Sequence, residues 1–106
     1  EYRAAAQELV QTGDSVLEVG CHAGGTSAIL VGAKGDGSFM GVDHGATVVA
    51  EARRRLPDVR FEVCDAFDVR RLLALGTAGR QPRYDVIFVD IGGGVRLGVL
   101  TQLLER

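Results

Sequence analysis

Short apolar runs and longer amphipathic segments alternate along this chain. The apolar runs are four to six residues long and lie between Gly, Asp or Pro residues, which is typical of buried strands. The longer segments repeat their apolar residues at helical spacing. This pattern predicts strands at residues 16–19, 38–43, 59–64 and 84–89, and helices at residues 1–12, 26–34, 46–56, 69–75 and 95–105.

Strand and helix alternate four times, which predicts an α/β fold with a mostly parallel sheet and helices on both faces, a three-layer sandwich. The connections between parallel strands are expected to be right-handed. In such sheets ligands bind beyond the carboxyl ends of the strands. Candidate functional residues are therefore sought at those ends.

Composition narrows the class of protein. A length of 106 residues predicts one domain, residues 1–106. The net charge of −2 makes nucleic acid an unfavoured partner. No apolar run is long enough to cross a membrane, and no membrane association is expected. The two cysteines are too few for a disulfide scaffold.

The most informative stretch runs from Val16 to Ser27, an apolar strand that breaks into a glycine-rich turn before a helix. Glycines let the backbone approach a ligand, and the helix end offers unpaired N–H groups and a partial positive charge. Either Thr26 or Ser27 is expected to cap that helix. The stretch predicts a site for a nucleotide-like ligand.

Four acids lie in or just after the predicted strands: Glu18, Asp43, Asp65 and Asp90. Asp43 comes 19 positions after Gly24, close to the offset of about 20 at which an acid binds ribose hydroxyls. Asp65 is predicted to hold the edge of the base. For both Asp43 and Asp65, the alternative role is to cap the helix that follows. Glu18 needs a buried partner, such as a ligand's ammonium group. Asp90 is assigned to substrate, a metal, the same ammonium group or a structural turn.

Three further reactive side chains fall near these acids. Cys21 is interpreted as a packed side chain because no base accompanies it. His22 is either a solvated loop residue or a catalytic one, and His44 is placed to touch the base. No Cys-x-x-Cys or His-x-x-x-His spacing supports zinc.

These residues together resemble the class I S-adenosylmethionine (SAM)-dependent methyltransferases. The family's first motif, acid-x-Gly-x-Gly-x-Gly, matches Glu18 to Gly24 (EVGCHAG), with His22 in place of the middle glycine. The later motifs match residues 41–43 (GVD), 64–66 (CDA) and 84–90 (YDVIFVD). The resemblance covers residues 14 to 94, with the motifs in the family's order.

The resemblance implies a Rossmann-like sheet of strand order 3-2-1-4, with SAM at its carboxyl rim. The glycine turn would take the methionine portion, Glu18 its amino group, Asp43 the ribose and Asp65 the adenine. No catalytic residue is implied. The implied cofactor-binding set is Glu18, Gly20, Cys21, His22, Gly24, Asp43, His44, Asp65, Ala66 and Asp90.

The family's sheet normally has seven strands, and only four are predicted here. The fourth strand, with the apolar run from Val86 to Val89, would then be an open edge prone to association. We expect either the cofactor-binding part of a longer enzyme or a homo-oligomer that pairs this edge. In the implied strand order the two cysteines lie too far apart for a disulfide, so free thiols and a cytoplasmic location are expected.

Three functions fit the sequence. The first is methyl transfer from SAM to an acceptor such as a small-molecule hydroxyl, because residues 88–90 (FVD) are similar to metal-dependent O-methyltransferases. This similarity at residues 88–90 is the only reason to keep a divalent metal as a candidate cofactor. The second is a non-catalytic Rossmann-like interaction module. The third is an NAD-dependent oxidoreductase, although residues 20–25 do not fit Gly-x-Gly-x-x-Gly.

Overall fold

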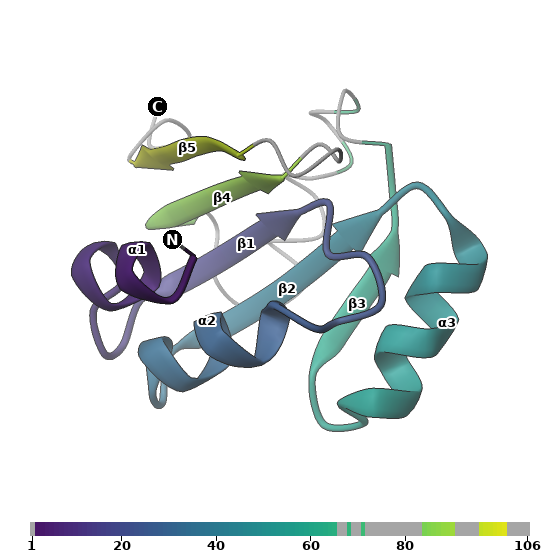
Figure 1. The fold of residues 1–106 in the computed structure, drawn as a ribbon, viewed down its shortest axis with the longest axis horizontal. Coiled ribbons are helices and arrows are strands. Elements are labelled where there is room, and N and C mark those ends of the chain that lie inside the picture. The colour runs from purple at the N-terminus through teal and green to yellow at the C-terminus, as the bar shows by residue number, and fades with distance from the viewer. Residues whose placement is uncertain (1, 66–67, 69–70, 72–83, 91–95, 102–106) are drawn as a thin grey trace.

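A computed structural model describes residues 2–65, 68, 71, 84–90 and 96–101 (Figure 1). The secondary structure largely follows the predicted alternation. Its helices are α1 (Tyr2–Leu9), α2 (Ser27–Lys34) and α3 (Ala46–Arg55), and its strands are β1 (Ser15–Val19), β2 (Ser38–Asp43), β3 (Arg60–Val63), β4 (Val86–Asp90) and β5 (Arg96–Thr101).

The five strands form one sheet in the order β3-β2-β1-β4-β5. The first four run parallel to one another, so the predicted order 3-2-1-4 is confirmed. β1 lies at the centre, between β2 and β4, and its register pairs Val19 with both Val42 and Val89. The carboxyl ends of four strands therefore meet at one rim.

The helix predicted at residues 95–105 is wrong, because residues 96–101 form β5, antiparallel to β4. Leu97 and Leu100 have helical spacing, but pairing with β4 satisfies the backbone groups of both strands and overrides that weak local preference. The expected open edge at β4, and an oligomer formed through it, are corrected for the same reason. The predicted helix at 69–75 and loop at 76–83 lie almost wholly outside the described residues.

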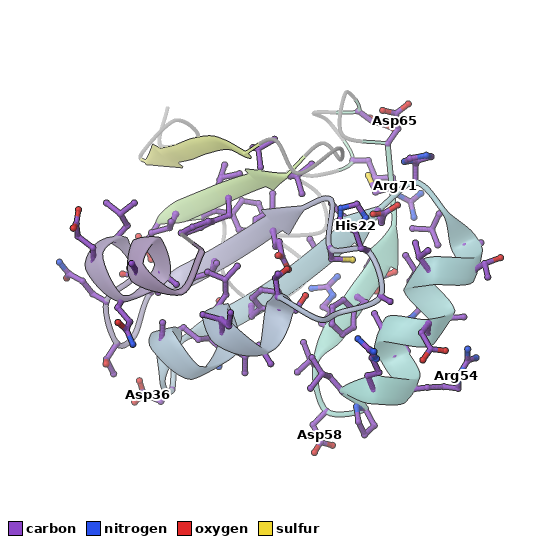
Figure 2. All side chains as sticks on the ribbon, viewed as in Figure 1. His22, Asp36, Arg54, Asp58, Asp65 and Arg71 are labelled. Carbon is purple, nitrogen blue, oxygen red and sulfur yellow. The ribbon has the colours of Figure 1, made fainter. Side chains whose placement is uncertain are left out.

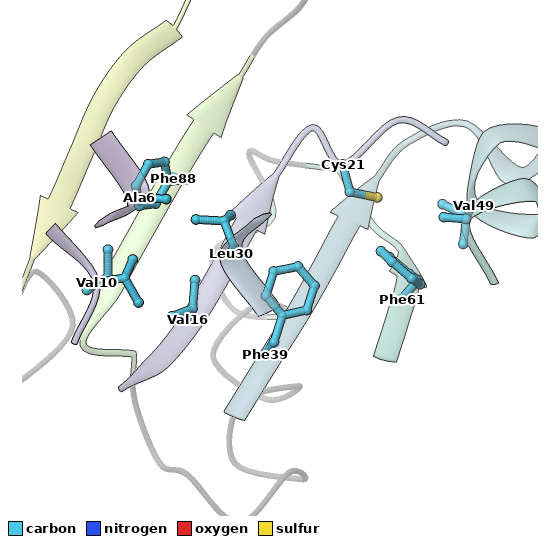
Figure 3. Close-up of a cluster of buried hydrophobic side chains, with 11 residues drawn as sticks. Ala6, Val10, Val16, Cys21, Leu30, Phe39, Val49, Phe61 and Phe88 are labelled. Carbon is cyan, nitrogen blue, oxygen red and sulfur yellow. The ribbon is translucent and has the colours of Figure 1, made fainter. Parts of the chain in front are cut away.

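All three described helices cover the same face of the sheet, where their apolar residues pack on alternate strand positions (Figures 1 and 3). Phe39 and Phe61 meet there edge to face, with ring centroids 6.1 Å apart. This cluster consists of Ala6, Val10, Val16, Cys21, Leu30, Phe39, Val49, Ala52, Phe61, Val86 and Phe88.

The opposite face carries a second buried cluster, which includes Leu17, Met40, Val42 and Ile87. Successive strand residues point to opposite faces, so these side chains alternate with those of the first cluster. Burial on both faces explains why the strands read as nearly continuous apolar runs. None of the three described helices lies on this second face.

Candidate functional site

The carboxyl ends of β1 and β2 are joined by backbone hydrogen bonds. The amides of Gly20 and Cys21 both donate to the carbonyl oxygen of Val42, at 2.8 and 3.0 Å. On the far side of β2, the amide of Cys64 donates to the carbonyl of Asp43 at 3.0 Å. The glycine turn therefore lies directly beside the acid that ends β2.

The turn takes its shape from three residues with positive φ: Gly20 at 88°, His22 at 52° and Gly24 at 89°. A Cβ atom on Gly24 would also come within 3.3 Å of the Ala52 Cβ on α3. His22 occupies the left-handed region without being glycine, a conformation in which histidine is several-fold enriched among side-chain-bearing residues. At the position where the sequence departs from the glycine motif, His22 thus has a positive φ that glycine adopts readily.

Glu18 is the fourth of the five residues of β1 and is completely buried. Its two oxygens accept hydrogen bonds from the hydroxyls that begin α2: Thr26 Oγ1 donates at 3.0 Å and Ser27 Oγ at 2.5 Å. These bonds satisfy a carboxylate that would otherwise be costly to bury. Thr26 is the N-cap residue of α2, but its side chain makes no cap bond, so the expected capping role of Thr26 is wrong. Its hydroxyl instead donates a hydrogen bond to Glu18.

The Asp43 carboxylate is held by two backbone amides. Its Oδ2 accepts from the His22 N–H and its Oδ1 from the Gly45 N–H, both at 3.0 Å. The imidazole Nδ1 atoms of His22 and His44 lie 3.7 and 3.6 Å from the same two oxygens. Gly45, and not Asp43, is the N-cap residue of α3. Asp43 instead fixes the glycine turn and the start of α3 around one buried carboxylate.

Cys21 points from the turn into the apolar cluster and is completely buried (Figure 3). Burial, assisted by the charges of Glu18 and Asp43, raises the pKa of its thiol to about 12. The thiol therefore stays protonated at neutral pH and is no nucleophile, in line with its interpretation as a packed side chain. Cys64 is also buried, burial raises its pKa too, and both cysteines are free thiols as predicted.

The remaining predicted site residues are placed less fully. Asp65 is exposed just after β3, and Figure 2 shows it with His22 and Arg71 at the end of the sheet to which β1–β3 point. His44 is 89% exposed beside Asp43. Asp90 is the last residue of β4, and its side chain is not described. Ala66 lies outside the described residues.

The described residues contain neither a metal-binding cluster nor a membrane-spanning helix. No three His, Cys, Asp or Glu side chains in them are grouped so as to hold a metal ion. None of the helices in this part of the chain has the length and apolar character needed to span a membrane.

Similarity to known proteins identifies the family to which this chain belongs. A sequence model of the protein-L-isoaspartate(D-aspartate) O-methyltransferase (PCMT) family matches residues 2–105. The chain belongs to this family. The PCMT family is one of SAM-dependent methyltransferases with the class I fold, so the resemblance inferred from the motifs is confirmed and the family implies SAM as cofactor.

Two individual relatives of the chain are also named as methyltransferases. A trans-aconitate 2-methyltransferase of Methylobacterium nodulans is 40% identical over 75 residues, which cover 71% of this chain and 26% of that protein. The structure of a protein-L-isoaspartate O-methyltransferase matches with a TM-score of 0.65 at 28% identity, over 85% of this chain and 28% of the other. The chain therefore spans about a quarter of the length of these relatives.

A third comparison concerns the fold alone. The structure of a TehB-like SAM-dependent methyltransferase from Corynebacterium glutamicum has a TM-score of 0.57 at 18% identity, over 88% of this chain and 62% of that one.

Sequence reasoning missed two features of this PCMT-family site. One is the pair of hydroxyls on Glu18, although an acid inside an apolar strand with Thr26 and Ser27 close behind it was a usable signal. The other is Gly41, where a Cβ would lie 2.8 Å from Phe61 Cδ1 and 3.0 Å from Cys21 Cβ. A glycine within an apolar strand marks such a close approach.

Proposed function

We propose that this chain binds SAM at the rim formed by the glycine turn and Asp43, and serves as the cofactor-binding part of a methyltransferase acting on a carboxylate oxygen. The observation that carries the proposal is the Asp43 carboxylate, which is buried, anchored by two amides and adjacent to a turn with three positive-φ residues. A carboxylate has about four acceptor positions, so two are left for the ribose hydroxyls.

Each part of the rim has a role in this proposal. Asp43 accepts the ribose hydroxyls, and the turn from Gly20 to Gly24 packs its backbone against the methionine portion. Glu18 is enclosed by protein, so it acts on the cofactor's ammonium group through its negative charge and by fixing the turn to α2. Asp65 and His44 border the adenine end. Bound SAM supplies an electrophilic methyl group, and the chain contributes by orienting it toward the acceptor.

The name of the family and the name of one relative support a carboxylate acceptor. The family name specifies isoaspartate and the curated relative's name specifies trans-aconitate, and both compounds carry carboxylates. A small-molecule hydroxyl, favoured by residues 88–90, is the competing acceptor class.

Calorimetry tests the cofactor site. We expect S-adenosylhomocysteine (SAH) and SAM to bind, and NAD to bind far more weakly. Asp43→Ala should weaken SAH binding by about 10- to 100-fold, the range for hydrogen bonds to a charged group. Asp36→Ala is the matched control, because Asp36 is an exposed acid in the turn before β2, at the opposite end of the sheet (Figure 2). Equal SAH affinity in the Asp43→Ala variant would contradict the proposal.

The acceptor class is tested with radiolabelled SAM and three acceptors: an isoaspartyl peptide, trans-aconitate and a catechol. Methyl esters release methanol in mild base and methyl ethers do not, so base-labile label identifies a carboxylate acceptor. Base-stable label on the catechol would favour a hydroxyl. SAH binding without transfer to any acceptor would favour the interaction-module alternative for this chain.

A further inference from the structure

Two imidazoles flank the carboxylate assigned to the ribose. Nδ1 of His22 lies 3.7 Å from Asp43 Oδ2, and Nδ1 of His44 lies 3.6 Å from Oδ1. At these separations neither ring makes a hydrogen bond, yet a movement of less than about 1 Å would create one. These are the chain's only two histidines, and both converge on one buried acid.

The backbone holds His22 in this position. Its φ of 52° and the bond from its own N–H to Asp43 Oδ2 hold the residue beside the carboxylate. The side chain is 52% exposed, whereas that of Asp43 is 6% exposed. The ring therefore stands at the outer side of the acid, where a ligand's ribose must approach. A glycine at this position would leave that approach open.

The other charged and titratable groups around Asp43 do not take over the role of the two histidines beside its carboxylate. On the β1 side, Glu18 is bonded to hydroxyls and Cys21 is a neutral thiol at ordinary pH. On the β3 side, Cys64 is a buried thiol with a raised pKa, Asp65 is exposed, and Arg71 interacts with Cys64. From α3 the Gly45 amide donates to Asp43.

We propose that His22 is a positioning residue for the cofactor, in that its charge state sets how well Asp43 accepts the ribose hydroxyls. The inference rests on the proposed SAM site. A neutral ring leaves the outward lone pairs of Oδ2 to the ribose. A protonated ring closes onto Oδ2 and occupies that acceptor position. Cofactor affinity should therefore fall when acidification protonates the ring.

His44 should contribute much less. Its ring is 89% exposed, so solvent screens its interaction with Asp43 more strongly than that of His22. It serves as the matched control, with nearly the same distance to the same carboxylate.

The test measures SAH affinity by calorimetry at pH 8.0, 6.5 and 5.5 for the parent, His22→Asn and His44→Asn. Asparagine tolerates positive φ and does not titrate. The dissociation constant of the parent should rise by about 3- to 10-fold between pH 8.0 and 5.5, as expected for one coupled ion pair of about 1 kcal/mol. His22→Asn should reduce the rise to less than 2-fold, and His44→Asn should keep most of it.

Reciprocal linkage gives a second readout. Saturating SAH should move the NMR titration midpoint of His22 to lower pH, and by more than that of His44. An unmoved His22 midpoint, or equal pH profiles in the parent and His22→Asn, would overturn the inference while the SAM site stands. Absence of SAH binding at pH 8.0 would overturn the proposed site as well.

Discussion

Glu18 places a negative charge inside an apolar strand, and two neighbouring hydroxyls make that arrangement stable. Thr26 and Ser27 come from the first residues of α2, so the bonds also fix the helix to β1 across the glycine turn. A hydrogen bond to a buried charge contributes more than one between neutral groups.

Ser27→Ala is therefore expected to lower the free energy of unfolding by about 1–3 kcal/mol, because a buried carboxylate oxygen loses a donor. Thr26→Ser keeps its hydroxyl and should change stability by less than about 0.5 kcal/mol. Urea unfolding followed by circular dichroism measures both. A Ser27→Ala variant as stable as the parent would show that other contacts support Glu18.

The sequence identified the residues of the candidate site more successfully than it predicted the contacts that these residues make. Glu18 was expected to need a partner, and its protein partners turned out to be hydroxyls expected to cap a helix. Their direction depends on the path of the turn, including the positive φ of His22, which no local pattern in the sequence encodes.

Within β2, Gly41 lets neighbouring elements approach closely. A methyl group there would lie 2.8 Å from Phe61 Cδ1 on β3 and 3.0 Å from Cys21 Cβ in the turn. Gly32, in α2, is a matched glycine with no atom within 4 Å of an added Cβ. The two positions separate a packing requirement from ordinary glycine flexibility.

Gly41→Ala should destabilise the fold by about 1–3 kcal/mol through overpacking. Gly32→Ala should stabilise it by up to about 1 kcal/mol, since alanine is the better helix former. Thermal unfolding should show the two midpoints moving in opposite directions, by roughly 4–8 °C per kcal/mol for domains of about this size. A tolerated Gly41→Ala would mean that Phe61 repacks freely.

The three described helices and strands β1 to β4 were predictable because each of these segments sits between clear turn or helix-end signals. β5 was not, since residues 96–101 carry leucines at a spacing that also fits a helix. Its antiparallel pairing with β4 is a contact between segments, and short apolar runs cannot distinguish strand from helix by periodicity alone.

The whole molecule is expected to lose folding stability at alkaline pH because of two buried side chains, Cys21 and Tyr84. Burial raises the pKa of Cys21 from 9.0 and that of Tyr84 from 10.0, in each case to about 12. The folded state thus retains protons that the unfolded chain releases, so stability is complete below about pH 9 and declines as pH rises toward 12.

Cys21 alone should lower the free energy of unfolding by about 1 kcal/mol between pH 9 and pH 10. Urea titrations at these two pH values should show a smaller decline in Cys21→Ala than in the parent, whatever the baseline stability of the variant. Tyr84→Phe should also reduce the decline. Identical declines in all three proteins would mean that neither group is protected in the folded state.

The order of the four parallel strands, β3-β2-β1-β4, followed from the alternation of strands and helices together with the family motifs. Parallel strands require crossovers of this kind, which leaves few arrangements of four strands.

The central position of β1 has a consequence for the order of folding. Its partner β2 follows after one helix, whereas the bonds between Ser15 and Asp85 at the start of β4 join residues 70 positions apart. Closing the longer loop costs more entropy, and contacts between distant residues slow folding. We expect amides of β1 and β2 to gain protection before those of β4 in pulse-labelled hydrogen exchange during refolding. Simultaneous protection of all three strands would indicate that the sheet forms in a single step.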